Sequence, residues 1–147
     1  MSTAPDPHVG TWVLDPSGSN FDANHRPRSA TLVIDCDGEG RYSITAEGIS
    51  EKGEKVTEKP QTIIPDGVRR TVPDFPGLSA VASRPDPRTL RADVRREDGS
   101  IAGEATYVVS ADRRSMTAIS CGFDSQLRQF RQETMWTRQS DASTTHT

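Results

Sequence analysis

The amino-acid sequence predicts an all-β fold, an antiparallel up-and-down β-barrel of about 8–10 strands. Short apolar runs recur at the roughly 8–12-residue spacing typical of β-sandwiches and barrels, and turn signals rich in glycine, proline and aspartate separate them. No segment of helical length shows an apolar period of about 3.6 residues. A meander of antiparallel strands has two exposed edges, and closure into a barrel removes them.

The turn signals divide the chain into about nine strands. Gly38–Gly40 and Asp98-Gly99 are typical of hairpin turns, whereas Pro60 predicts an edge position or a bulge. The last segment is rich in glutamine, arginine and glutamate, and its pattern is ambiguous. After a first strand around Trp12, the expected strands cover residues 29–37, 41–49, 54–67, 78–83, 89–97, 100–110, 115–123 and 126–138.

Composition and charge limit the class of protein. The chain has 147 residues, which suits one domain, and only 32% of them are hydrophobic, as expected when every strand exposes one face. The net charge of -3 does not favour contact with a phosphate backbone, so we expect no nucleic-acid partner. We expect a single barrel domain at 9–138, a flexible leader at 1–8 and a flexible tail at 139–147.

The cysteines and the hydropathy pattern predict a cytoplasmic protein. Cys36 and Cys121 are too few for a disulfide framework. The first residues are polar, and no run approaches the ~20 apolar residues of a membrane span, so we expect no membrane contact. The three histidines lack metal-ligand spacing, and no phosphate loop or dinucleotide fingerprint is present. We therefore expect no metal and no cofactor.

Alternate side chains of a strand face opposite sides of a sheet, so the sequence also predicts which residues point inward. Tyr42, Tyr107, Gln132 and Trp136 belong to this inward set. Small residues on the same faces leave room for a cavity, namely Ala46, Ala92, Gly103 and Ala105. Alternatively, the inward polar groups bond one another or ordered water in a narrow, filled core. The segment 115–123 has apolar residues of both parities, and its orientation stays open.

Three segments of the chain resemble a known family, and one of them, PDGVRRTVPDFPGL at residues 65–78, looks like its Asp-Gly, Tyr-Pro-Val segment before a central strand. GTWVLDPSGSNF, residues 10–21, resembles the opening GTWxLNxxKSxF of a bacterial family of small lipocalin-like, or calycin-type, β-barrel proteins, and YVVSADRRSMTAISCGFDSQ, residues 107–126, is similar to its segment xVxSxDGKTMTxxxxGxDxxG. The likeness spans about residues 9–138. Gly18 replaces the lysine of the family pattern, and Leu127 replaces a glycine. The resemblance implies a barrel with an internal cavity but no single activity.

The resemblance also gives Trp12 a role. In lipocalin-like barrels the tryptophan of Gly-x-Trp plugs the closed end, and a basic residue from the last strand packs over it. Arg138 is similar in position, and a guanidinium over an indole ring is a cation–π contact. We therefore expect Trp12 to be structural, with ligand stacking as the alternative.

We expect the barrel to bind a small, largely apolar organic molecule. His25 and Phe75 lie in two loops, 20–28 and 65–77, that are expected to frame the entrance. The oligomeric state is left open, with a homodimer as one option. The candidate ligand-binding residues are Trp12, His25, Phe75, Cys121, Phe130, Gln132 and Trp136.

Two other functions remain as alternatives. On the same barrel, a cofactor-free cyclase or isomerase of a biosynthetic intermediate would use Glu58, Tyr107 and Tyr42 as catalytic residues. An inward Glu58 would have a raised pKa suited to acid–base chemistry, whereas a bulge at Pro60 would turn it outward. The third alternative is a module that binds a protein partner through an exposed strand edge.

Overall fold

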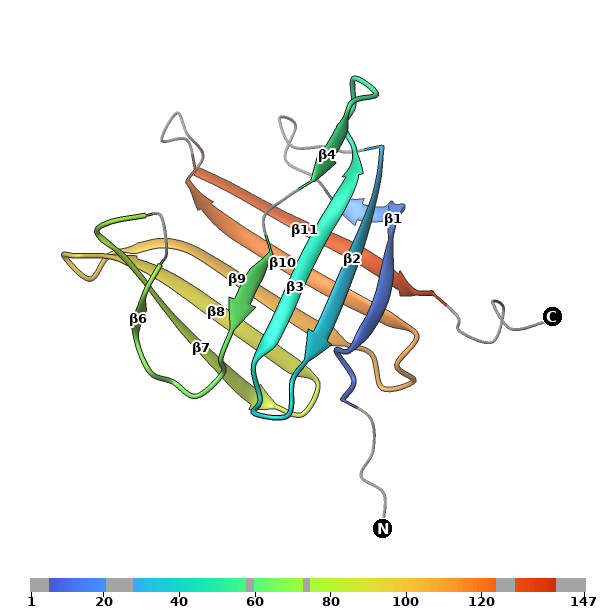
Figure 1. Cartoon of the computed structure of the whole chain (residues 1–147). Helices are drawn as coiled ribbons and strands as arrows, with labels where there is room; N and C mark the ends of the chain where they lie inside the picture. Colours follow the sequence, from blue (N-terminus) through green and yellow to red (C-terminus); the bar gives the residue numbers. More distant parts are fainter. Residues whose placement is uncertain (1–5, 21–27, 58–59, 73–74, 124–128, 140–147) are drawn as a thin grey trace, which may run out of the picture.

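The computed structural model describes residues 6–20, 28–57, 60–72, 75–123 and 129–139. These residues form eleven strands and no helix, which confirms the all-β prediction (Figure 1). None of the described residues belongs to a helix long and apolar enough to span a membrane. The strands are β1 (Gly10–Asn20), β2 (Ser29–Cys36), β3 (Tyr42–Ile49), β4 (Lys55–Thr57), β5 (Gln61–Ile63), β6 (Arg70–Thr71), β7 (Leu78–Asp86), β8 (Thr89–Arg96), β9 (Ile101–Val109), β10 (Ser115–Phe123) and β11 (Gln129–Arg138).

All strands belong to one antiparallel sheet in the order β4-β3-β2-β1-β11-β10-β9-β8-β7-β6, and β5 pairs with β3 beside β4. The first strand pairs with the last, which brings Trp12 opposite Arg138. Figure 1 shows the sheet curled on itself, so that β2 and β3 cross in front of β10 and β11. Within the described residues no ladder joins β4 or β5 to β6, so the up-and-down sheet has two short edges there.

The strand count exceeds the expected 8–10 because the predicted strand at 54–67 is divided into β4 and β5 and because the predicted loop 65–77 contains the short strand β6. β4 pairs Thr57 with Glu47, and β5 pairs Ile63 with Tyr42, so the second ladder is offset by one residue from the first. This offset is the bulge that Pro60 suggested. Without a bulge at Pro60, alternation along 54–64 would turn Thr62 and Ile64 inward; with the offset, Ile63 is buried instead and Thr62 is exposed.

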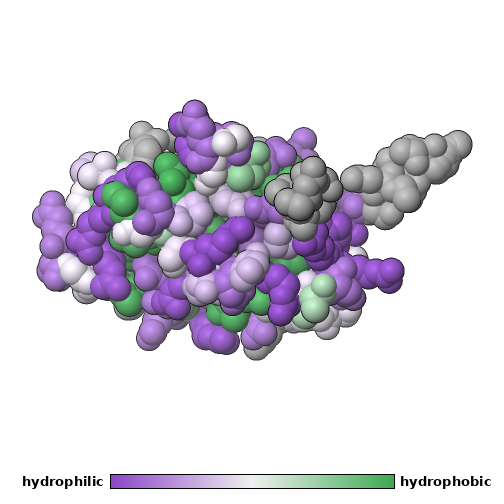
Figure 2. Space-filling model, turned by 90° about the horizontal axis from the view of Figure 1, so that it is seen from below, coloured by the Kyte–Doolittle hydropathy of each residue, from purple (hydrophilic) through white to green (hydrophobic). Residues whose placement is uncertain are grey.

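The predicted inward faces of β3 and β8 are confirmed, since Ile44 and Leu90 are buried core residues. The pairing of β10 with β11 settles the strand whose orientation was open. Met116 lies opposite Trp136 and Ala118 opposite Thr134, and all four are buried. The outer surface is largely hydrophilic with small separate apolar patches on the face shown in Figure 2.

One end of the barrel is plugged by Trp12, which is completely buried. The Arg138 guanidinium lies 4.3 Å from the centre of its ring, so the predicted cation–π contact is present. Arg138 also donates to the carbonyls of Arg113 (2.7 Å), Val9 (2.7 Å) and Pro7 (2.6 Å). These contacts join the start of the chain to its last strand.

Gly10 has a geometric reason to precede this tryptophan. Its φ of 144° is a conformation that residues with a side chain rarely adopt. A Cβ at this position would lie 2.5 Å from an Arg138 guanidinium nitrogen. The Gly-x-Trp pattern therefore reflects the close approach of Arg138 to the backbone.

Candidate functional site

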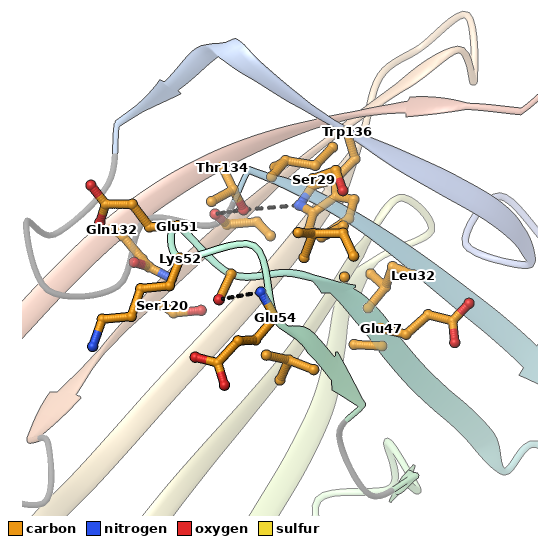
Figure 3. Close-up of a pocket in the computed structure, with 18 of the residues that line it drawn as sticks. Ser29, Leu32, Glu47, Glu51, Lys52, Glu54, Ser120, Gln132, Thr134 and Trp136 are labelled. Carbon is orange, nitrogen blue, oxygen red and sulfur yellow. Dashed lines mark hydrogen bonds between the residues drawn. The ribbon is translucent and has the colours of Figure 1, made fainter.

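A cavity of about 680 Å³ lies between β2–β3 and β10–β11, beneath the turn at 50–54 that joins β3 to β4 (Figure 3). Its volume exists partly because small residues occupy the inner faces of these strands. Ala46 and Ala118 both line it, and Gly48 lies nearer the turn. A Cβ at Gly48 would meet the Ser29 carbonyl oxygen at 2.3 Å, so the close packing of β2 against β3 requires glycine here.

The deep part of the cavity is apolar. Leu14, Leu32 and Trp136 line it and belong to the buried core of the protein. Tyr107 packs against the same core from β9. Contact with these side chains removes apolar ligand surface from water, which stabilises a complex by roughly 25 cal/mol per Å².

A polar strip crosses the wall formed by β10 and β11. Trp136 Nε1–H donates to Thr134 Oγ1 at 2.9 Å, and the Thr134 hydroxyl donates to the Ala118 carbonyl at 3.2 Å (Figure 3). Ser120 pairs with Gln132 one step nearer the mouth. The Gln132 Oε1 atom is buried and has no hydrogen-bond partner among the described residues. The strip therefore presents polar groups within an otherwise apolar wall.

The mouth of the cavity is charged. Glu51, Lys52 and Glu54 line it and are exposed, whereas the exposed Glu47 borders the cavity from the outer face of β3, one residue after the inward Ala46. In Figure 3 the Lys52 and Glu54 side chains extend away from Trp136. Ser50 Oγ accepts a hydrogen bond from the Glu54 backbone at 3.1 Å, which shapes the turn.

A second polar cluster lies at the plugged end, away from this cavity. The Tyr42 hydroxyl donates to the Asp6 carboxylate, and Arg84 donates to the Tyr42 hydroxyl and, at 3.1 Å, to Asp6. His8 is completely buried, and its Nε2 lies 3.0 Å from the Tyr107 carbonyl oxygen. Burial lowers the pKa of His8, with the nearby Arg84 charge acting in the same direction.

This cluster includes part of the segment that the sequence placed in a flexible leader. Asp6, Pro7 and His8 are described, and Pro7 and His8 are buried against the barrel. Trp12 Nε1–H donates to the His8 carbonyl at 3.0 Å. The packed chain therefore begins at least three residues before the expected boundary at residue 9.

The structure brings three of the predicted site residues to the cavity, namely Tyr107, Gln132 and Trp136. Trp12 and Tyr42 lie at the plugged end instead. Phe75 is 58% exposed and does not line the cavity. Glu58 and His25 lie outside the described residues, as does the side chain of Phe130.

Cys121 is on the outer face of β10. Its thiol lies 3.5 Å from Glu104 Oε2, and burial, followed by that hydrogen bond, raises its pKa. It does not line the cavity, because the register of β10 against β11 places Ser120, one residue earlier, on the inner wall. Neither Ser120 nor the glutamates of the 50–54 turn were predicted as site residues. The sequence signal that could have indicated the turn is the pair of glutamates, Glu51 and Glu54, on either side of Lys52-Gly53.

The described lining of the cavity offers hydrogen bonding and apolar contact. Among the residues that the structure describes, no three His, Cys, Asp or Glu side chains are grouped as metal ligands. The carboxylates that line the cavity within the described chain are all exposed.

Comparison with known proteins supports the fold. No protein-family model and no curated protein sequence matches the chain. Among solved structures, the chain is similar to the wild-type fluorescent protein UnaG, with 11% identity and a TM-score of 0.60 over 89% of this chain and 96% of UnaG. It is also similar to the zebrafish ileal bile acid-binding protein complexed with cholic acid, with 11% identity and a TM-score of 0.57 over 90% and 99% of the two chains.

A third similar structure is EF1p2_mFAP2b bound to DFHBI, with 11% identity and a TM-score of 0.53 over 95% of this chain and 99% of the other. At this identity the similarities show the fold alone. The chain therefore has the fold of these up-and-down β-barrels, as the sequence predicted, but no ladder closes its sheet within the described residues. The resemblance to one bacterial family has no sequence match behind it and stays a prediction.

Proposed function

We propose that the protein is a binding barrel whose cavity holds a small, largely apolar organic molecule. The cavity between β2–β3 and β10–β11 carries this proposal. Its volume of about 680 Å³ lies within the range of about 300–1,000 Å³ typical of small-molecule sites. It combines an apolar interior with a few polar groups, which is the usual composition of such sites.

The lining residues suggest separate roles. Leu14, Leu32 and Trp136 would contribute apolar contact, while Gln132 and Ser120 would orient the ligand through hydrogen bonds. The names of two similar structures include a bound organic molecule, cholic acid in one and DFHBI in the other. This supports a ligand-binding use of the fold without identifying a ligand for this chain.

No observation favours the cyclase, isomerase or partner-binding alternatives over this proposal. Tyr42, one of the three candidate catalytic residues, is engaged with Asp6 and Arg84 at the other end of the barrel. Glu58 lies outside the described residues. The edges at β4 and β6 consist of three and two residues, which offers few backbone groups to a partner strand.

Native mass spectrometry of the protein purified from its own host tests the proposal directly, since it detects a retained molecule. A paired set of variants tests the location. Ala118→Phe adds a ring inside the cavity, and Ile119→Phe adds one on the opposite face of the same strand. We expect the released molecule, or an apolar fluorescent probe, to bind wild type and Ile119→Phe but not Ala118→Phe.

Equal binding to both variants would contradict the cavity as the site. A wild-type protein that retains no molecule and binds no probe would refute the function itself. Circular dichroism of each variant checks that the β-sheet is intact.

A further inference from the structure

Two side chains on the wall of the cavity carry polar atoms that no neighbouring residue uses. Ser120 and Gln132 lie directly opposite each other on β10 and β11, and both line the cavity (Figure 3). Within the described chain, Ser120 Oγ makes no hydrogen bond, and it is not shielded from the cavity. Its hydroxyl is therefore open to a bound molecule, as a donor or as an acceptor.

The Gln132 amide is closed at one end and open at the other. Its Oε1 atom is shielded and has no partner among the described residues, so a ligand does not reach it. Its Nε2 atom makes no hydrogen bond with the described residues either, but it is not shielded. The side chain lies on the same inner face as Thr134 and Trp136. The group that Gln132 presents to the cavity is therefore an N–H donor.

The deeper polar groups of the same wall are already paired with each other. The Trp136 indole N–H donates to Thr134 Oγ1, and the Thr134 hydroxyl donates to the Ala118 carbonyl. On the β10–β11 wall, the polar atoms open to a ligand thus belong to Ser120 and Gln132, one step nearer the mouth than Thr134. The Trp136 ring offers apolar contact beyond them.

This pair of groups favours a ligand that brings an acceptor. An apolar molecule in the cavity displaces water from Ser120 and Gln132, and unless it supplies an acceptor the Gln132 N–H loses a hydrogen bond on binding. Side chains directly opposite on antiparallel strands have Cβ atoms about 4.5–5.5 Å apart, so both donors can meet at one atom. A carbonyl oxygen has two lone pairs and accepts from both.

The charges at the mouth do not select the sign of a ligand. Glu51 and Glu54 on the 50–54 turn are negative, and Lys52 on the same turn is positive. A Cβ at Gly53 would lie 3.4 Å from an Arg28 guanidinium nitrogen, which places a second cation against this turn. Among the described residues of the turn and its neighbour the charges therefore balance, and the selection depends on hydrogen bonding.

We propose that the cavity selects apolar molecules that carry a carbonyl oxygen, and that Ser120 Oγ–H and Gln132 Nε2–H donate to this oxygen while the apolar body packs against Trp136. This specificity rests on the proposed ligand-binding function. It adds the chemical class of the ligand and its orientation, with the carbonyl group nearer the 50–54 turn and the apolar body deeper.

Two probes with the same apolar body, ethylpyrene and acetylpyrene, test the specificity because they differ by one carbonyl oxygen. Their Kd values come from titrations followed by the fluorescence of the buried tryptophans. The quantity compared is the Kd of ethylpyrene divided by that of acetylpyrene, since the difference in hydration between the probes is the same for every variant. We expect this ratio to fall about fivefold from wild type to Ser120→Ala and to Gln132→Leu, which corresponds to one net hydrogen bond.

The control is Gln129→Leu, which makes the same chemical change at an exposed position of β11 and should leave the ratio unchanged. Gln132→Leu breaks no side-chain hydrogen bond with a described residue, so its Tm should not fall below that of wild type. Pyrenemethylamine is protonated at neutral pH and offers donors only. Its binding should therefore not weaken in Gln132→Leu.

The infrared C=O stretch of bound acetylpyrene detects the hydrogen bonds directly, because a donor on the oxygen weakens the carbonyl double bond. We expect a lower frequency in the wild-type complex than in the complex of the double variant Ser120→Ala with Gln132→Leu. Equal frequencies in the two complexes would overturn the proposal. If Gln132→Leu does not fold, Ser120→Ala decides by the same comparison with wild type.

The outcomes separate the two proposals. If neither pyrene probe binds to wild type, the ligand-binding function fails and this specificity fails with it. If ethylpyrene binds and the Kd ratio is the same in wild type and in both variants, the function stands and the specificity is overturned. Weaker binding of pyrenemethylamine to Gln132→Leu, with no change for acetylpyrene, would show that Gln132 acts as an acceptor and would overturn its role as a donor.

Discussion

Replacement of Arg138 by lysine should destabilise the barrel far more than its conservative chemistry suggests. The guanidinium reaches three backbone carbonyls, those of Arg113, Val9 and Pro7, at 2.6–2.7 Å, and it stacks on Trp12. A lysine ammonium is a single point of charge on a flexible stem and does not match this planar fork. At least two of the carbonyls would therefore lose their donor.

The magnitude follows from these contacts. A partly buried carbonyl that loses its donor costs about 1 kcal/mol or more, and the weaker cation–π contact adds about 0.5 kcal/mol. The sum is at least about 2.5 kcal/mol and is taken as about 3 kcal/mol because each carbonyl can cost more than 1 kcal/mol, with no allowance for coupling between groups that act together. For a domain of this size each kcal/mol lowers Tm by about 2–4 °C, so we expect Tm to fall by about 6–12 °C.

Urea unfolding followed by tryptophan fluorescence measures this change, since Trp12 and Trp136 are both buried. Arg131→Lys provides the control on the same strand. Arg131 is 60% exposed, and its 4.0 Å ion pair with Glu133 lies at the surface, so its replacement should have a much smaller effect. If Arg138→Lys shifts the urea midpoint no more than Arg131→Lys does, the Arg138 contacts do not stabilise the barrel as argued.

Three further changes test other parts of the structure by the same unfolding assay. Because the pKa of His8 in the folded protein is lowered below its ordinary 6.5, the unfolded chain binds a proton more readily at this residue, so stability should fall as pH drops below about 6.5. His8→Asn should weaken this pH dependence of stability, and an unchanged pH profile in the variant would contradict the role of His8. Gly48→Val should cost about 2 kcal/mol, because its Cβ would meet the Ser29 carbonyl at 2.3 Å, and a neutral effect would show that β2 and β3 separate easily. Thr134→Val should cost about 1–3 kcal/mol by leaving the Trp136 indole N–H without its acceptor, and a stable variant would indicate a substitute partner.

The fold was predictable because strand faces and turns depend on residues that are close together in the sequence. Alternating hydrophobicity fixed the inner faces of β3 and β8, and Pro60 marked the offset between β4 and β5. The Trp12–Arg138 contact followed from a family resemblance, and the structure explains it by the pairing of the first strand with the last. Strand β10 was not predictable, because apolar residues occur on both of its faces and only its two neighbours set its register.

The candidate site was only partly predictable because parity gives the face of a residue but not its depth. Tyr42 and Ala46 share the inner face of β3, yet Tyr42 bonds Asp6 at the plugged end and Ala46 lines the cavity. Depth depends on how strands are staggered across the whole sheet, and that is a property of many pairings at once. For the same reason, the predicted set of site residues mixes Tyr107 and Gln132, which line the cavity, with Tyr42 and Trp12, which lie at the plugged end.

The two ends of the barrel therefore differ in how much their side chains contribute to stability. At the plugged end, Arg138, Arg84 and Asp6 are held by several hydrogen bonds each, so replacement of any one leaves other groups without partners. At the mouth, Glu51 and Lys52 are exposed, and a change in their charge has little effect on folding. Stability therefore depends more on the plugged end than on the charged mouth.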